Sequence, residues 1–350
     1  MSVVRILRET ATGETRWVAL DSTGRPVALH LERSSDLETR AHLGDVCHAR
    51  LRAIQPRQGG GFMELPSGEN AFIRLDEGHG LTEGQSLRVE VVSEARRDKL
   101  TRVQKAGETA SPEHSRDARW RSRLPGAASV PVEDVAVGDA EISAAWDEAL
   151  SESVTLPGGG TLHIQPTKAL VAVDLDTAGR NDAGRAAARA LRINTEGAQE
   201  LARQVSLRNL GGAMVLDCVS PINRESGLKT RDAFVAAFKA LSHRNARALA
   251  PSAFGLMEAS VAWGAAPLAD RLLQPDGQPT DETVCLEGLR QIQREARVQP
   301  MARLTLALPR RAYDWMAASG LDLTRQLDES YGARLNVLPH DHSKPDIFQT

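Results

Sequence analysis

Three aspartates near the middle of the chain have the setting of a metal site. Asp174 and Asp217 each follow directly on a short apolar run, at 169–173 and 213–216. Such runs predict neighbouring strands buried on both faces, so each strand would end in a carboxylate at the rim of a sheet. Asp176 lies two residues past Asp174 and would point to the same side. Three carboxylates in one small volume repel one another unless a cation lies between them, so we expect a magnesium site here.

The segment between the two runs supports this arrangement. From 194 to 208 the apolar residues recur at i, i+3, i+4 and i+7, which predicts an amphipathic helix. Gly211 and Gly212 then end it, because glycine readily adopts the left-handed cap conformation. A strand, a crossover helix and a returning strand form one βαβ-like unit, and ligands of such sheets bind beyond the carboxyl ends of the strands.

At these residues the chain resembles the ribonuclease E/G family of endoribonucleases. The matching segments are 156–177, 194–204, 208–212 and the run that leads into Asp217, in the family's order and spacing. The resemblance implies that Asp174 and Asp217 hold a catalytic magnesium ion within a DNase I-like domain. Asp176, where the family usually has asparagine, would complete or orient the ligand shell.

The composition of the chain limits its domain number, its disulfide content and its cellular compartment. The chain has 350 residues, 41% hydrophobic content and a net charge of −3, which fits two or three domains and gives no global nucleic-acid signal. Its three cysteines are odd in number and far apart, which argues against a disulfide framework and favours a reducing compartment. Without a signal-peptide pattern or a membrane-spanning run, we expect a cytoplasmic protein.

A small barrel is predicted from about residue 44 to 105, where five short strands alternate with glycine-rich turns, as in an OB-fold. Phe62 and Phe72 lie on adjacent predicted strands and would either stack on RNA bases or fill the barrel core. The resemblance favours RNA contact, because the family's barrel carries two phenylalanines at this spacing. Arg96, Arg97 and Lys99 begin the most basic window of the chain and are expected on the barrel edge, touching RNA.

We therefore expect an α+β multidomain protein: an OB-fold β-barrel, an α/β DNase I-like/RNase H-like catalytic domain and a small α/β C-terminal domain. The expected boundaries are 1–40 for an N-terminal hairpin that forms an RNase H-like piece, 41–105 for the barrel, 106–150 for a shortened linker, 151–272 for the catalytic domain and 273–350 for the C-terminal domain. Relative to the family, the linker is too short for a 5′-end sensor. The Cys-x-x-Cys pair that would bind zinc between subunits is missing, and Cys285 instead fits a helix core. We expect no zinc, and any homo-oligomer would form without a zinc link.

Two functions remain open at this stage. The first is a magnesium-dependent endoribonuclease that cleaves single-stranded RNA in RNA processing or decay, including rRNA processing. The second is a non-catalytic RNA-binding protein that keeps the fold. Ala253 and Val261 stand where the family has arginines, and Ser220 stands where it has an acid, which favours reduced activity.

Overall fold

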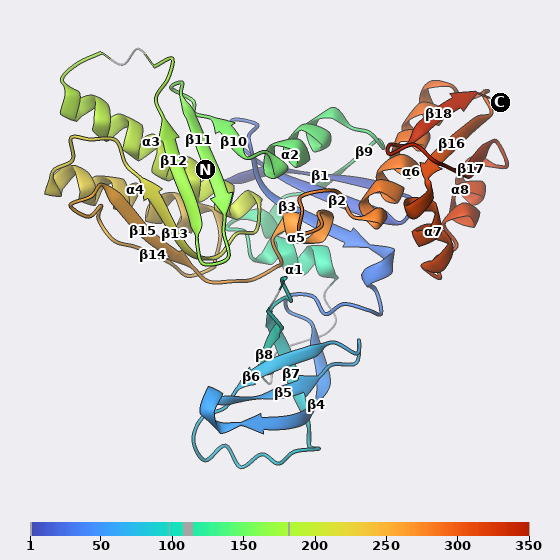
Figure 1. Ribbon diagram of the computed structural model, residues 1–350, viewed down its shortest axis with the longest axis horizontal. Helices are drawn as coiled ribbons and strands as arrows, with labels where there is room; N and C mark the ends of the chain where they lie inside the picture. Colours follow the sequence, from blue (N-terminus) through green and yellow to red (C-terminus); the bar gives the residue numbers. More distant parts are fainter. Residues whose placement is uncertain (1, 98, 108–114, 181–182, 350) are drawn as a thin grey trace.

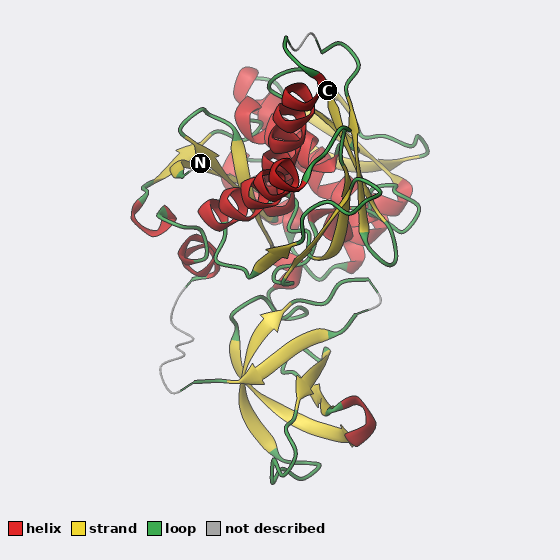
Figure 2. Cartoon of the chain, turned by 90° about the vertical axis from the view of Figure 1, so that its left-hand side faces the viewer, coloured by secondary structure: helices red, strands yellow, loops and turns green. Residues whose placement is uncertain are grey.

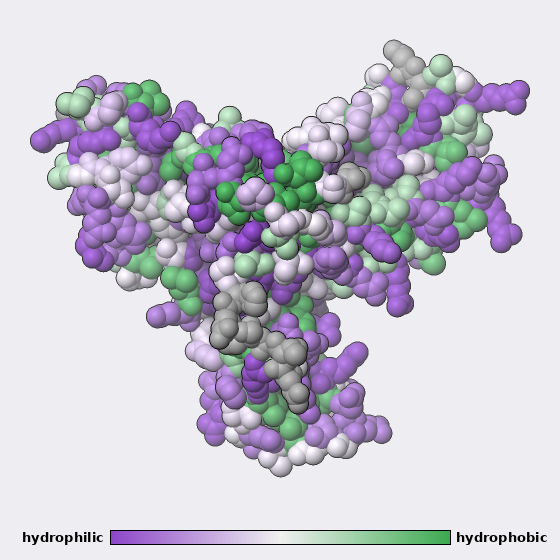
Figure 3. Space-filling view, turned by 180° about the vertical axis from the view of Figure 1, so that it is seen from behind, coloured by the Kyte–Doolittle hydropathy of each residue, from purple (hydrophilic) through white to green (hydrophobic). Residues whose placement is uncertain are grey.

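The computed structural model describes residues 2–97, 99–107, 115–180 and 183–349, which form three lobes and a separate C-terminal module (Figure 1). Figure 3 shows the same lobes from behind, with hydrophilic residues spread over each of them. Within the described residues, every helix is too short or too polar to cross a membrane.

The central lobe is built on a four-stranded sheet, in the order β3-β2-β1-β9, which we call the N-terminal sheet. Its first three strands form an antiparallel meander, and β9 returns to pair with β1 in parallel. Helix α2 packs Ile142, Ala145, Trp146 and Ala149 against one face of the sheet. The elements are β1 (Val3–Ala11), β2 (Glu14–Asp21), β3 (Pro26–Arg33), α1 (Arg116–Ser122), β9 (Val132–Val135) and α2 (Ala140–Leu150), with short 3-10 turns η1 (Ser34–Asp36) and η3 (Ala127–Ser129).

Two expectations for this lobe differ from the structure. A further strand, β1, pairs with the predicted hairpin. The sequence pattern did not indicate it, because the apolar residues of β1 alternate over only part of its length. Most of the predicted linker, 116–150, is instead ordered into α1, β9 and α2. The reason is burial: the apolar residues of α2 recur at i, i+3, i+4 and i+7 and cover the N-terminal sheet.

The second lobe is a closed five-stranded barrel in the order β4-β5-β6-β8-β7, consistent with an OB-like fold (Figure 2). Its core consists of small and medium apolar side chains from all five strands, such as Leu51, Met63, Ile73, Val89 and Val103. The predicted five strands are therefore confirmed. They are β4 (Val46–Gln55), β5 (Gly60–Glu64), β6 (Asn70–Arg74), β7 (Ser86–Ser93) and β8 (Thr101–Lys105), with η2 (Pro56–Gln58) between β4 and β5.

The third lobe holds the predicted strand pair, within a six-stranded sheet of order β10-β11-β12-β13-β15-β14 that we call the large sheet. Helices α3 and α4 lie side by side and bury one face, with Phe234 and Phe238 fully buried (Figure 1). Among the described residues, no helix covers the opposite face, which we call the open face (Figure 1). The elements are β10 (Ser153–Thr155), β11 (Thr161–Pro166), β12 (Val171–Asp176), α3 (Ala186–Leu207), β13 (Gly212–Asp217), α4 (Arg224–Leu241), β14 (Ala246–Ala248) and β15 (Leu256–Val261).

The chain then returns along the N-terminal sheet and ends in the expected α/β unit, which we call the C-terminal module. Its three-stranded sheet, in the order β17-β16-β18, packs on α6 to α8 around Leu289, Ile292 and Leu306. Cys285 lies in this core, as its helical setting predicts. The elements are α5 (Leu268–Leu272), α6 (Asp281–Val298), β16 (Leu304–Pro309), α7 (Arg310–Ala318), α8 (Leu323–Tyr331), β17 (Leu335–His340) and β18 (Asp346–Gln349).

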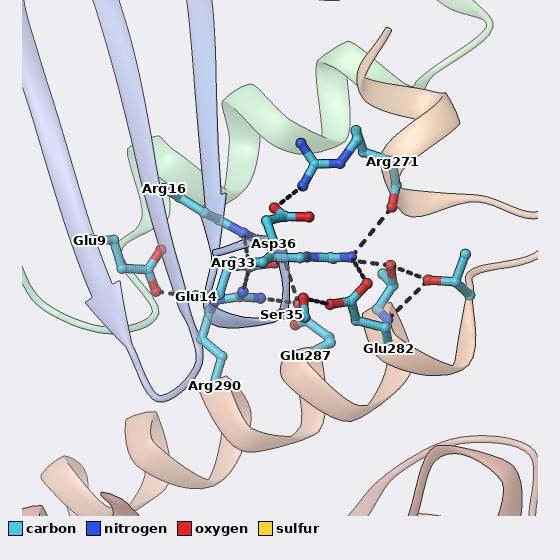
Figure 4. A network of polar contacts seen from close by, with 12 residues as sticks. Glu9, Glu14, Arg16, Arg33, Ser35, Asp36, Arg271, Glu282, Glu287 and Arg290 are labelled. Atoms are coloured by element: carbon cyan, nitrogen blue, oxygen red, sulfur yellow. Dashed lines mark hydrogen bonds and ion pairs between the residues drawn. The ribbon is translucent and has the colours of Figure 1, made fainter. Parts of the chain in front are cut away.

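A buried ion-pair network joins the C-terminal module to the N-terminal sheet (Figure 4). The Glu14 carboxylate is fully buried and accepts hydrogen bonds from Arg16 Nε at 2.6 Å, from Arg33 Nε at 2.8 Å and from Arg290 of α6. Burial alone would raise the pKa of Glu14, but the three guanidinium groups outweigh it and hold the pKa well below its usual range. Glu14 is therefore ionised and fixes α6 against the sheet.

Candidate active site on the large sheet

The two aspartates lie beside each other. Strands β12 and β13 are parallel, with Val173 opposite Leu216, so the next residues, Asp174 and Asp217, are side by side on neighbouring strands. Such strands lie about 4.8 Å apart. Both side chains are on the open face and exposed, because the residues before them point into the core under α3 and α4. Within the described part of the chain, neither carboxylate makes an ion pair or hydrogen bond.

Asp176 does not join them as expected. It is exposed and on the same face, but its Oδ1 accepts the backbone N–H of Ala178 at 2.8 Å, so it begins the turn after β12. Among the described residues, the structure brings together no group of three or more histidine, cysteine, aspartate or glutamate side chains suited to a metal ion. The site is a pair of carboxylates rather than a cluster of three.

Two neighbouring elements hold the end of β13 in place. Asn194, buried in α3, accepts the Val219 N–H at 2.7 Å and donates to the Val219 carbonyl at 2.9 Å. The Cys218 N–H donates to the Gly255 carbonyl at 3.0 Å. These bonds leave the backbone around Asp217 little freedom. Burial raises the pKa of the Cys218 thiol to about 12, so this thiol is not a nucleophile at neutral pH.

Sequence reasoning missed one further polar side chain of the site. His163 of β11 lies opposite Asp174 across an antiparallel pair, so it projects onto the same open face. Its Nδ1 is 2.8 Å from the Ser153 hydroxyl, which orients the ring. The sequence did contain a signal for His163. The turn at 167–170 fixes the register between β11 and β12, and this register places His163 opposite Asp174.

The phenylalanines of the barrel lie outside its core. Phe62 of β5 and Phe72 of β6 are direct cross-strand partners, and their half-buried rings meet edge to face at 5.9 Å between centroids. The alternate residues Met63 and Ile73 fill the barrel instead. Gly60 makes room for the pair, because a Cβ there would lie 2.3 Å from the Phe72 ring. The two rings therefore form one outer face of the barrel.

The three basic residues predicted to touch RNA differ in their surroundings. The Arg96 guanidinium lies 3.9 Å from the centre of the Trp263 ring, and Arg97 pairs with Asp270 of α5 at 3.0 Å. Both arginines thus join the barrel to the segment that follows the large sheet. Lys99 is exposed. Of the three, Arg96 is half-buried, whereas Lys99 and Arg97, whose side chain is 57% exposed, both reach solvent.

The departures from the family also have distinct settings. Val261 is buried in the core under α3 and α4, whereas Ala253 and Ser220 are exposed near the end of β13. An arginine at position 261 would have no room on this backbone. Of the two positions where the resemblance implies arginine, Ala253 is therefore the exposed one near the carboxylate pair.

The fold and this site define an α+β protein with an OB-like barrel and a carboxylate pair at adjacent strand ends. Residues 88–261 match the Ribonuclease E/G family, so this segment of the chain belongs to that family, as the sequence resemblance indicated. It is similar to Ribonuclease E of Nostoc sp. (strain PCC 7120), at 37% identity over 99 residues, which are 28% of this chain and 14% of that protein. It is also similar to Ribonuclease E of Escherichia coli (strain K12), at 34% identity over 93 residues, or 26% of this chain and 9% of that protein. The matched part thus spans only a small share of either relative.

Proposed function

We propose that this protein is an endoribonuclease of the ribonuclease E/G type, which cleaves single-stranded RNA at Asp174 and Asp217. The single observation that carries this proposal is the parallel register that sets these two exposed carboxylates side by side on the open face. The family membership of residues 88–261 supports RNA as the substrate. On this proposal the large sheet with α3 and α4 is the DNase I-like domain.

The donor set fits a magnesium ion. Mg²⁺ prefers carboxylate oxygens and is commonly held by one or two carboxylates together with substrate phosphate and water. Asp174 and Asp217 offer such oxygens without competing ion pairs in the described part of the chain. When bound, the ion supplies positive charge beside the scissile phosphate, where negative charge develops.

The remaining chemistry belongs to the chain. The Asn194 bonds and the Gly255 carbonyl hold the backbone beyond Asp217 and so fix the position from which its carboxylate projects. His163 is oriented by Ser153 and lies on the same face, where it can exchange a proton with the water or the leaving oxygen. The outer Phe62–Phe72 face of the barrel would stack on bases and bring the strand to this domain.

A second candidate function is RNA binding without efficient cleavage. It is favoured by the exposed Ala253, since the family's arginine there would place a cation near the end of β13. In this case the barrel would bind RNA, and the carboxylate pair would be a remnant of an active site.

The test is cleavage of an end-labelled, AU-rich single-stranded oligonucleotide with and without Mg²⁺. We expect Asp174→Asn and Asp217→Asn each to lower the cleavage rate at least 100-fold while RNA affinity persists. Asp328→Asn, an exposed carboxylate of α8, is the matched control and should cut like the parent. Unchanged cutting by either site variant would refute the nuclease assignment to this pair. RNA binding by the parent without any magnesium-dependent cutting would favour the second function.

A further inference from the structure

The open face of the large sheet is hollowed beside the carboxylate pair. The hollow has a volume of about 510 Å³, which is large enough for a nucleotide-sized ligand. It runs from Ala213 and Val215 of β13 across β15 to β14. The side chains that line it include Val215, Arg247, Leu249, Leu256, Glu258 and Ser260.

An aromatic ring projects into solvent at the end of this hollow nearest Asp217. Phe254 is 89% exposed, far more than its neighbours Leu249, at 64%, and Leu256, at 36%. Full burial of a phenylalanine stabilises a fold by roughly 1.5–3 kcal/mol. An exposed ring such as that of Phe254 forgoes nearly all of this stabilisation. Together with Leu249 and Leu256 of the hollow it forms a group of exposed apolar side chains, and such patches mark interaction sites.

The backbone of a tight turn fixes the position from which this ring projects. The turn 252–255 is closed by a bond from the Gly255 N–H to the Ser252 carbonyl at 2.9 Å, and the Phe254 N–H donates to the Ser252 hydroxyl at 3.3 Å. Gly255 has φ +84°, which a side chain would strain. A Cβ on Gly255 would lie 4.0 Å from Asp217 Oδ1, so the turn lies against the carboxylate pair.

A single cation lies farther along the same hollow. Arg247 of β14 is exposed and pairs in register with Ser260 of β15, which itself pairs with Ala213 of β13. Within the described residues, its guanidinium makes no ion pair. From strand spacing and rise, its Cα lies roughly 16 Å from that of Asp217. Phe254 lies beyond the end of β13 and Arg247 lies toward its start, so along the strand direction the carboxylates lie between the aromatic ring and the guanidinium.

This order matches a single nucleic-acid strand. We propose that Phe254 stacks on the base next to the scissile phosphate and that Arg247 contacts a backbone phosphate a few nucleotides away. The inference rests on RNA being the ligand, as in the proposed function, and makes Phe254 a positioning residue for the cleavage site.

The test measures RNA affinity separately from cleavage. In an Asp174→Asn background, which should bind but not cut, Phe254→Ala should weaken binding of a labelled single-stranded oligonucleotide by roughly 5- to 150-fold, the equivalent of one lost stack. Phe254→Trp should restore affinity, because any aromatic face stacks on a base. Met301→Ala, which removes a 94% exposed apolar side chain from the C-terminal module, is the matched control and should leave affinity unchanged.

Two further measurements locate the contact. An abasic site next to the cleaved bond should cost the parent as much affinity as Phe254→Ala, and the two changes together should cost no more than either alone. Arg247→Gln should reduce the dependence of log affinity on log salt by about 0.7, the value for one phosphate contact on a single strand. Independent, additive losses would overturn the stacking contact, and an unchanged salt slope would overturn the phosphate contact.

Failure of this inference differs from failure of the proposed function. If the parent cuts RNA and Phe254→Ala changes neither affinity nor cleavage position, the inference is refuted and the nuclease assignment stands. If the parent binds but never cuts, a loss of affinity in Phe254→Ala still supports the inference. If Phe254→Ala instead converts a dimer to a monomer with RNA affinity unchanged, the patch is a self-association surface and the inference is wrong.

Discussion

Replacing Glu14 by glutamine tests whether the buried network fixes the C-terminal module. Together, the two carboxylate oxygens of Glu14 accept hydrogen bonds from three arginines, and the Glu14 side chain has no solvent exposure. Glutamine keeps one acceptor, but its amide NH₂ would face a guanidinium, so at least one arginine donor loses its partner. Removing one member of a buried ion pair typically costs about 3–5 kcal/mol.

The structure places the expected loss near the lower end of that range. Glu287 and Glu282 also pair with the same arginines, and their side chains are 44% and 22% exposed, so they can partly compensate. We expect Glu14→Gln to lower the free energy of unfolding of this unit by about 3 kcal/mol. Hydrogen exchange in α6 should accelerate accordingly, while the barrel strands should be unaffected, because the barrel does not contribute to the network.

Urea denaturation combined with hydrogen-exchange mass spectrometry measures both effects. Glu133→Gln is the matched control, because it makes the same change in the same sheet at an exposed pair with Arg5. It should cost less than about 1 kcal/mol. A loss below about 1 kcal/mol in Glu14→Gln, or unchanged exchange in α6, would refute the role given to the network.

The same carboxylate should make this unit sensitive to acid. Its pKa is lowered in the folded state from an ordinary value of 4.5, so its contribution is complete above about pH 4.5. The contribution is lost as the pH falls toward the folded-state pKa. In a pH series of melting temperatures, Glu14→Gln should show a smaller decline below pH 4.5 than the parent.

Three further predictions concern other parts of the molecule. Phe62→Ala and Phe72→Ala should each weaken RNA binding by about 1–3 kcal/mol in a fluorescence titration and change the melting temperature little, whereas a large loss of stability would show that the rings support the barrel. Burial lowers the pKa of His42 from 6.5 to about 4, so its contribution to stability is present above pH 6.5 and falls as the pH drops toward 4. The parent should lose stability in that window and His42→Phe should lose less, and equal slopes would contradict this assignment. Asn194→Ala should cost about 1–3 kcal/mol and slow cleavage, because it leaves the Val219 N–H and carbonyl unsatisfied; a normal rate would show that these bonds do not position Asp217.

The sequence predicted those parts of the fold that depend on local patterns. The apolar runs before Asp174 and Asp217, and the helical period between them, lead directly to β12, α3 and β13. The pairing of β1 with β9 joins segments more than a hundred residues apart, and no local pattern encodes such a contact. For this reason the segment expected as linker proved to be part of the central lobe.

The candidate site was predictable to a similar degree. Adjacent strand ends place two carboxylates together, but whether Asp176 joins them depends on a turn that its own side chain begins. The exposure of Phe254 could not be predicted, since a phenylalanine in sequence is more often buried. Only the conformation of the turn 252–255 reveals that this ring faces solvent.

Because β12 and β13 pair in parallel, the carboxylate pair exists only when these two strands keep their present register. Side chains alternate along a strand, so a shift by a single residue would carry Asp217 from the open face to the side beneath α3 and α4. Lengthening or shortening the loop that leads into α3 would leave this alignment intact. Deleting one residue inside β13 would instead separate the two carboxylates onto opposite sides of a sheet that is otherwise preserved, and no neighbouring acid on β13 could take the place of Asp217.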